Sequence, residues 1–361
     1  MPLVVRLFTN FNNNTANTMK TFLTKTLGLS LIITLMVACN DLTLGPEPAN
    51  TPETNFDLLW QEFDRLYGQF ETKNIDWNAA YARYRPLVKP GMSDNELFDV
   101  VSHMLGELND GHVWLLKPGP DYRRYDSGPT YPGGDFSLNV ISKYVQEQKE
   151  ISTVEGVNVL YGKLAGNVGY IYFVNLGQSP HFYEKAMDQA LAALADTKGI
   201  IVDVRNLDGG LDRSSQYVAG RFARERRLFM TTRFRNGPKH TDFTAPTEWY
   251  VAPTGRLQYT KPVYLLTNRL TQSAGETFTL AMNQIATVTQ LGDTTFGIFS
   301  DNPKRELPNG WIYSVSPGDF RAADGKSYEG IGIAPKIRVV NTKEDIAAGK
   351  DIVLEAALKR L

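Results

Sequence analysis

The sequence predicts an α/β protein preceded by a bundle of helices. Apolar side chains recur every three or four residues before position 112, which is typical of amphipathic helices. Later in the chain, short apolar runs alternate with amphipathic stretches, which favours a largely parallel sheet with covering helices. A length of 361 residues suits this division. We expect a helical bundle over 56–112, a β/loop connecting region over 113–160, and an α/β core with a C-terminal helix over 161–361.

The composition indicates a globular protein and argues against one class of partner. Hydrophobic residues make up 42% and aromatic residues 11% of the chain, enough for a sizeable core. Lysine and arginine number 38 against 39 acidic residues, so the chain lacks the excess of basic residues that binding to phosphate backbones requires. We expect no nucleic-acid partner.

Residues 1–39 read as an export signal. Lys20 and Lys25 precede an apolar run over 27–38, which is too short to span a bilayer. The run ends in Met-Val-Ala directly before Cys39, the single cysteine of the chain, and this ending resembles the lipobox of bacterial lipoproteins, with Met in place of the usual Leu. An ordinary signal peptide with an incidental cysteine is the alternative.

Lipidation at Cys39 would place the protein in the cell envelope. Two or three acyl chains give stable membrane attachment, so the anchor would sit in a bacterial membrane with the fold facing the periplasm or the cell surface. Residues 40–55 are rich in Pro, Thr, Glu and Asn and read as a solvated tether. A single cysteine excludes both an intrachain disulfide and a Cys/His metal cluster.

The expected elements follow in order along the chain. Ser93 and Glu96 have the spacing of a capping box, so a helix should begin there. The first helix should bury one face, made by Phe56, Leu59, Trp60, Phe63 and Tyr67. In the core we expect strands at 168–174, 199–204, 262–266 and 288–291, and helices at 182–194, 274–285 and 352–361. Ligands of such sheets bind beyond the carboxyl ends of the strands, so the segments after 204 and 266 are of most interest.

Ser273 stands at the start of an expected helix. One interpretation is structural, because Ser273 and Glu276 match a capping box. The other is catalytic, because a serine at a helix N-terminus lies beside free N–H groups that can stabilise an oxyanion, the N–H of Ala274 among them. Taken alone, the segment is compatible with both.

Gly209 and Gly210 follow the expected strand at 199–204. Glycines let the main chain approach a substrate and aim an N–H at a carbonyl oxygen, although a tight turn would use the same residues. His112 follows Asp-Gly in a loop after the third helix, where a side chain can reach a cleft. The other three histidines lack neighbours that suggest chemistry.

Four motifs in this order resemble peptidase family S41, which includes the C-terminal processing peptidases and the tricorn core protease. They are L-N-D-G-H at 108–112, D-V-R-x-x-x-G-G at 203–210, T-x-S-A-G-E at 271–276 and Y-E-G-I-G-I-A-P at 328–335. The resemblance covers the chain from Phe56 to its C-terminus and implies a crotonase/ClpP-like catalytic core.

The resemblance implies a role for five residues. Ser273 matches the nucleophile, His112 the general base and Glu329 the acid that orients it. Gly209 and Ala274 match the oxyanion hole. No metal or cofactor is implied.

Three positions depart from the family patterns. Ile298 stands where processing peptidases carry a lysine base, so that serine–lysine dyad is absent. Gly111 replaces the serine that precedes the histidine in tricorn-type sites, and Leu207 replaces a common asparagine. The stretch between 113 and 162 is also too short for a PDZ domain.

We therefore expect a serine-type peptidase that hydrolyses peptides or unfolded protein segments in the cell envelope. Two alternatives stay open. One is a non-catalytic member of the same fold that binds a peptide or an apolar ligand. The other is a serine–lysine peptidase that uses Lys304.

Overall fold

The computed structural model describes residues 48–361, and residues 51–361 form one compact unit. The predicted signal peptide, including Cys39, lies outside the described residues, as does most of the predicted tether. Within the described range, no helix has the length and apolar character needed to cross a bilayer.

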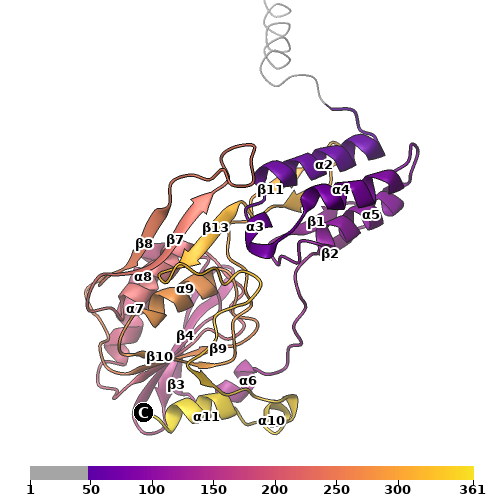
Figure 1. Ribbon diagram of the computed structural model, residues 1–361. Helices are drawn as coiled ribbons and strands as arrows, with labels where there is room; N and C mark the ends of the chain where they lie inside the picture. Colours follow the sequence, from indigo (N-terminus) through magenta and orange to yellow (C-terminus); the bar gives the residue numbers. More distant parts are fainter. Residues whose placement is uncertain (1–47) are drawn as a thin grey trace, which may run out of the picture. The chain divides into compact units, whose positions relative to one another are not determined.

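A group of helices opens the compact unit (Figure 1). The predicted capping box is confirmed: the Ser93 N–H donates to Glu96 Oε2 (2.9 Å), and Ser93 Oγ accepts the Glu96 N–H (3.4 Å). Four of the five residues of the predicted apolar face, Phe56, Leu59, Phe63 and Tyr67, have no exposed area, whereas Trp60 is partly exposed. The elements are α2 (Pro52–Leu66), α3 (Phe70–Lys73), α4 (Trp77–Tyr84), the 3-10 turn η1 (Arg85–Leu87) and α5 (Asp94–Gly106).

A four-stranded antiparallel sheet completes this helical part, and half of it comes from far along the chain. Its order is β11-β12-β1-β2. Trp311 and Tyr313 from this late segment are buried among the side chains of the helices. The strands are β1 (Trp114–Lys117), β2 (Arg123–Asp126), β11 (Lys304–Glu306) and β12 (Ile312–Ser314). The helical part therefore reaches beyond the expected range of 56–112. We call the helices and this sheet the helical lobe.

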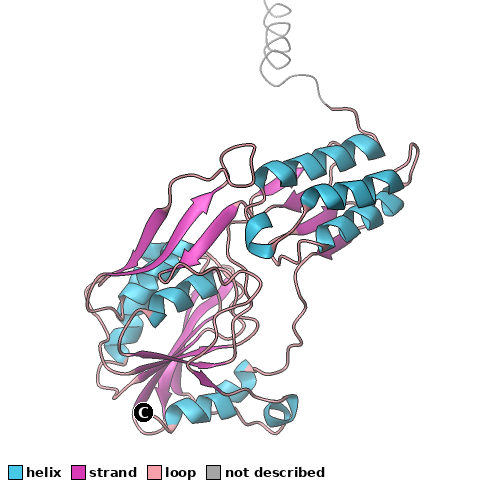
Figure 2. Cartoon of the chain, viewed as in Figure 1, coloured by secondary structure: helices cyan, strands magenta, loops and turns pink. Residues whose placement is uncertain are grey.

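The central sheet has seven strands in the order β14-β10-β9-β6-β5-β4-β3. Figure 2 shows strands in magenta and helices in cyan. Neighbours from β14 to β5 pair in parallel, whereas β4 and β3 are antiparallel. The sheet begins at Gln146, earlier than the expected boundary at 161. The strands are β3 (Gln146–Thr153), β4 (Gly156–Leu164), β5 (Val168–Phe173), β6 (Ile200–Asp203), β9 (Val263–Thr267), β10 (Val288–Gly292) and β14 (Ile337–Arg338).

Helices cover both faces of the sheet because alternate strand side chains point to opposite sides. On β5, Ile171 and Phe173 pack in one core cluster with side chains of three helices, while Tyr170 and Tyr172 pack in another with the C-terminal helix. The first face carries α7 (Pro180–Ala193), α8 (Asp212–Gly220) and α9 (Ala274–Asn283), and the second carries α6 (Leu138–Ile141) and α11 (Ile352–Leu358), with α10 (Lys343–Ala347) just before α11.

A third sheet, in the order β13-β7-β8, packs against helices α8 and α9, which cover the first face. Phe229, Met230, Val251 and Phe320 join the core there. Its strands are β7 (Arg227–Phe234), β8 (Thr247–Val251) and β13 (Gly318–Ala322).

Two neighbouring parallel strands position the site. Strands β6 and β9 pair in register, with Asp203 opposite Leu266. The segments that follow them therefore leave the sheet at one edge, where ligands of such sheets bind. The segment after β6 contains Gly209 and Gly210, and the segment after β9 contains Ser273.

Candidate active site

Ser273 lies at the N-cap of α9 in an unusual main-chain conformation. Its φ is 54° and its ψ is −121°, a region that a residue with a side chain adopts at a cost of about 1–3 kcal/mol. The Ser273 hydroxyl lies 3.0 Å from Nε2 of His112, within the range for a nucleophile and its base. Folding thus brings together two residues that lie 161 positions apart in the sequence.

Glu276 does more than cap the helix that follows Ser273. One carboxylate oxygen accepts from Thr295 Oγ1 (2.6 Å) and the Gly297 N–H (2.7 Å), and the other from the Ile298 N–H (2.8 Å) and the Ser273 N–H (3.3 Å). Burial raises the pKa of Glu276 to about 8, against these four hydrogen bonds, which favour the ionised form. Glu276 therefore ties the turn at 295–298 to the nucleophile, a role that the capping pattern alone did not reveal.

His112 is held by its main chain and has a buried ring. Its N–H donates to Asp110 Oδ1 (2.8 Å), and Ser314 Oγ donates to its carbonyl oxygen. Burial lowers the pKa of His112; Asp110 opposes that change and Lys73 adds to it. A neutral imidazole is what a general base must be before it takes a proton.

The two expected oxyanion donors lie beside Ser273. Gly209 has a φ of 125°, and a Cβ atom there would lie 3.1 Å from Ser273 Cβ and 3.9 Å from the Ala274 nitrogen. Only glycine permits this approach. Neither the Gly209 nor the Ala274 N–H donates a hydrogen bond within the described part of the chain, so both are available to a substrate oxygen.

Glu329 lies near the His112 loop but does not hydrogen bond to the His112 ring. One carboxylate oxygen accepts the Phe299 N–H (2.7 Å), and the other lies 2.7 Å from Lys73 Nζ. Burial, and then the charge of Asp110, raises the pKa of Glu329 to about 8, while Lys73 acts in the opposite direction. Glu329 therefore makes no direct hydrogen bond to the His112 ring in this structure. Lys73 was not expected at the site.

Leu207, which replaces the common asparagine of the family motif, packs well in its loop. Its side chain is fully buried, and its carbonyl oxygen accepts the Gln272 N–H (3.0 Å). A Cβ atom on Gly275 would lie 3.0 Å from Leu207 Cδ2, so this side chain fits against the start of α9. The loop thus keeps its place beside Ser273 without an asparagine.

The D-V-R part of the second motif is structural. Arg205 is buried and its guanidinium lies 2.6 Å from Asp203 and 3.0 Å from Asp351. Because Asp351 caps α11, this ion cluster joins the end of β6 to the C-terminal helix.

Other candidate bases lie outside the site. Lys304, on β11, is exposed, and its Nζ lies 5.9 Å from the ring centre of Trp114. His240 Nε2 lies 2.8 Å from Asp64, and its ring stacks on Phe70.

A cleft of about 510 Å³ opens beside Ser273. It combines aromatic walls with polar groups, and burial raises the pKa of one of them, Asp212, to about 6. Its lining is Pro180, Gly210, Leu211, Asp212, Arg213, Phe234, Trp249, Ser273, Ser300, Asp301, Asn302 and Phe320. Sequence analysis did not identify this set, because three strands of the β13-β7-β8 sheet, together with helices and loops far apart in the chain, contribute to it.

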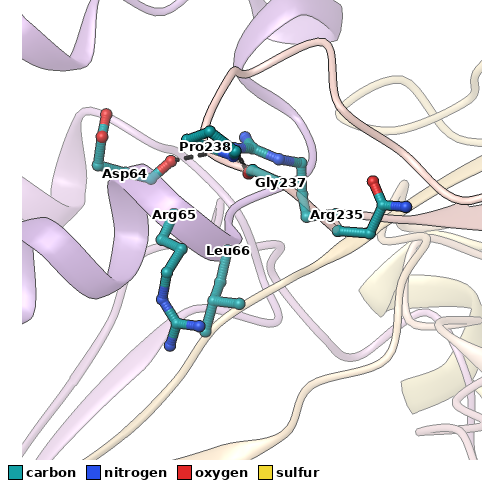
Figure 3. A pocket seen from close by; sticks show the side chains of 7 residues that line it. Asp64, Arg65, Leu66, Arg235, Gly237 and Pro238 are labelled. Carbon is teal, nitrogen blue, oxygen red and sulfur yellow. Dashed lines mark hydrogen bonds between the residues drawn. The ribbon is translucent and has the colours of Figure 1, made fainter.

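A second pocket of about 480 Å³ lies between the end of α2 and the turn after β7 (Figure 3). There the Arg235 guanidinium donates to the carbonyl oxygens of Asp64 (3.3 Å) and Gly237 (3.2 Å). The pocket lining contains neither Ser273 nor His112. These hydrogen bonds join the end of α2 to the turn after β7, which indicates a structural role.

Comparisons with known proteins identify the family. The profile of peptidase family S41 matches residues 167–339, and that of the tricorn protease C1 domain matches residues 48–106. The carboxy-terminal processing protease CtpA of Bacillus subtilis (strain 168) is 26% identical over 360 residues, which span 85% of this chain and 73% of that protein.

Solved structures share the fold. A protein from Parabacteroides merdae ATCC 43184, provisionally described as a peptidase, is 34% identical with a TM-score of 0.75, covering 86% of this chain and 96% of that one. The tricorn protease is 17% identical with a TM-score of 0.54, covering 86% of this chain and 36% of that one, so it supports the fold alone.

A serine peptidase is the class of enzyme that the fold and these relatives define. The chain belongs to peptidase family S41, and its similarity to carboxy-terminal processing proteases is evident over most of its length.

Proposed function

We propose that Ser273 is the nucleophile of this peptidase and His112 its general base. The Ser273 oxygen attacks a peptide carbonyl carbon while its proton passes to His112 Nε2. The imidazolium then donates that proton to the leaving amine as the C–N bond breaks. Water attacks the resulting acyl-enzyme, with His112 again taking a proton, and Ser273 is regenerated.

The developing oxyanion would be stabilised by main-chain groups. The N–H groups of Gly209 and Ala274 flank Ser273 and have no other acceptor in the described chain. Such preorganised donors contribute about 3–4 kcal/mol each to the transition state in serine peptidases.

One observation carries this proposal: Ser273 Oγ lies 3.0 Å from His112 Nε2 at the N-terminus of α9. The competing serine–lysine reading lacks support, because Lys304 contacts Trp114 instead. The membership in a peptidase family argues against a purely binding role.

We propose peptides or unfolded protein segments as substrates. The cleft beside Ser273 is open along Phe234, Trp249 and Phe320, which suits extended chain with bulky side chains. Its mixed lining gives no reason to expect a metal or cofactor in the reaction.

Labelling with a fluorophosphonate probe tests the nucleophile. The wild-type protein should become labelled, Ser273→Ala should not, and His112→Ala should label far more slowly. Ser300→Ala is a matched control, because Ser300 lines the same cleft and its hydroxyl accepts the Gly318 N–H. Labelling that persists in Ser273→Ala, or is lost in Ser300→Ala alone, would contradict the assignment.

We also propose that the protein is anchored in the cell envelope through a lipid on Cys39. The support is the charged start, short apolar run and Met-Val-Ala-Cys ending of the sequence. Metabolic labelling of the full chain with a radioactive fatty acid in a bacterial host should mark the wild type and not Cys39→Ala. Equal labelling of both would disprove the anchor.

A further inference from the structure

Lys73 is a charged residue of the helical lobe that reaches the candidate active site. It is the last residue of α3, and its side chain is 12% exposed. Its Nζ lies 2.8 Å from the Asn109 carbonyl oxygen, 3.2 Å from that of Leu108 and 2.7 Å from Glu329 Oε1. The ammonium group donates hydrogen bonds to the two carbonyl oxygens and forms an ion pair with Glu329.

These contacts connect the segments that surround His112 to one another. Lys73 holds the main chain just before His112 on one side and the Glu329 carboxylate on the other. Glu329 in turn accepts the Phe299 N–H, next to Ile298, whose side chain packs on Gly111. The series of contacts that starts at Lys73 therefore ends at Gly111, the residue before His112.

We propose that Lys73 is a positioning residue for this site: its ammonium group fixes the Glu329 carboxylate and the 108–112 loop as one unit and thereby sets the place of the His112 ring. The catalytic meaning of this inference rests on the proposed function of Ser273 and His112. Glu329 then acts on His112 through Lys73 and the loop, without contacting the ring.

Lys73 also affects the charge of Glu329. Asp110 and Glu329 are both buried, with 1% and 4% of their surface exposed. The charge of Asp110 raises the pKa of Glu329 and the charge of Lys73 lowers it, so Lys73 favours the ionised form of Glu329. Tyr67 also lies against both acids, and burial together with Asp110 and Glu329 raises its pKa, so it stays neutral.

The sign of the effect on His112 follows from the surrounding charges. Asp110 favours the imidazolium and Lys73 opposes it, while burial opposes it more strongly than either charge. Removing the positive charge of Lys73 should therefore raise the pKa of His112. The acid limb of a pH–rate profile should move to higher pH.

The test uses Lys73→Met and Lys73→Arg in the full chain. NMR titration of the His112 ring, assigned with His112→Asn, should show a raised pKa in Lys73→Met and a value near wild type in Lys73→Arg. With a peptide substrate, Lys73→Met should lose kcat by at least about tenfold with a smaller change in KM, since a displaced base affects the chemical step. Lys163→Met is the control, because Lys163 forms a surface pair with Asp196 (2.9 Å).

A double variant guards against loss of folding. If Lys73→Met leaves Glu329 buried without a partner and the protein unfolds, Lys73→Met/Glu329→Gln removes both charges. Its kcat should be no lower than that of Lys73→Met in any folded preparation, because the two residues act as one unit.

The outcomes separate this inference from the proposed function. An unchanged His112 titration in both Lys73→Met and the double variant would overturn the positioning role, even in an active enzyme. Losses of kcat that simply add would also overturn it. If Lys73→Met shifts the His112 titration while the wild-type protein neither hydrolyses peptides nor reacts with a fluorophosphonate, the proposed function is contradicted and the coupling of Lys73 to His112 stands.

Discussion

A Cβ atom on Gly111 would lie 2.7 Å from Cγ2 of Ile298, and 2.9 Å from Cε1 of Phe296. Separations this short do not occur between real side chains, so Ile298 and Gly111 fit only as a pair. These are two of the three positions at which the chain departs from the family patterns. The two departures therefore meet at one contact, and a side chain at position 111 would force Ile298 to move.

Gly111→Ser should be destabilising for this reason. Overpacking a filled site typically costs about 1–3 kcal/mol, and the forced shift would also displace the adjacent His112. Urea unfolding should show the lower stability, and Gly111→Ser/Ile298→Ala should recover part of it. The interpretation fails if Gly111→Ser unfolds at the same urea concentration as the wild type.

The activity should persist into mildly acidic solution. Burial is the main cause that lowers the pKa of His112 below its ordinary value of 6.5. A base with a lowered pKa stays neutral to lower pH, so the acid limb of kcat/KM should lie below pH 6.5. Initial rates across pH with one peptide substrate would measure it. A limb above pH 6.5 would show that another group controls the reaction or that acidic neighbours dominate.

Glu276→Gln should disturb the nucleophile without altering its side chain. Both carboxylate oxygens of Glu276 accept hydrogen bonds, so an amide would place N–H against N–H on one side. A buried donor left unpaired costs about 1–3 kcal/mol. Chemical unfolding should show this loss, and fluorophosphonate labelling of Ser273 should slow. Glu306→Gln, at an exposed position of β11, is the control and should change neither quantity.

Arg205→Met should reduce stability far more than it affects the pH profile. It leaves Asp203 and Asp351 buried without their cation, a type of change that costs about 3–5 kcal/mol. Thermal unfolding would measure the effect. At a temperature where the variant is folded, its acid limb should coincide with that of the wild type, in contrast to Lys73→Met. A displaced limb would assign Arg205 to the site itself.

The core of the fold could be predicted because its signals are local. The strand expected at 168–174 is β5 at Val168–Phe173, and the helix expected at 182–194 is α7 at Pro180–Ala193. Fully apolar runs and amphipathic spacing specify such elements without knowledge of their neighbours. Ser273 and His112 were likewise predicted, through motifs whose order along the chain resembles a known family.

Elements defined by distant partners could not be predicted. Strand β11 has the sequence Lys-Arg-Glu, all exposed, which has none of the alternation of a half-buried strand. Lys73 looked like any other basic residue, because its acceptors at Asn109 and Glu329 become neighbours only on folding. Glu329 was predicted to orient His112, and the ion pair with Lys73 could not be foreseen from the sequence.

The late strands of the helical lobe have a consequence for biosynthesis. A ribosome delivers α2 to β2 long before it delivers β11 and β12, which supply half of the sheet beneath those helices. The lobe lacks the side chains of Trp311 and Tyr313 while residues 127–303 are translated. Since Ser314 Oγ also donates to the His112 carbonyl oxygen, the loop that carries His112 gains this contact only after that late segment has been synthesised.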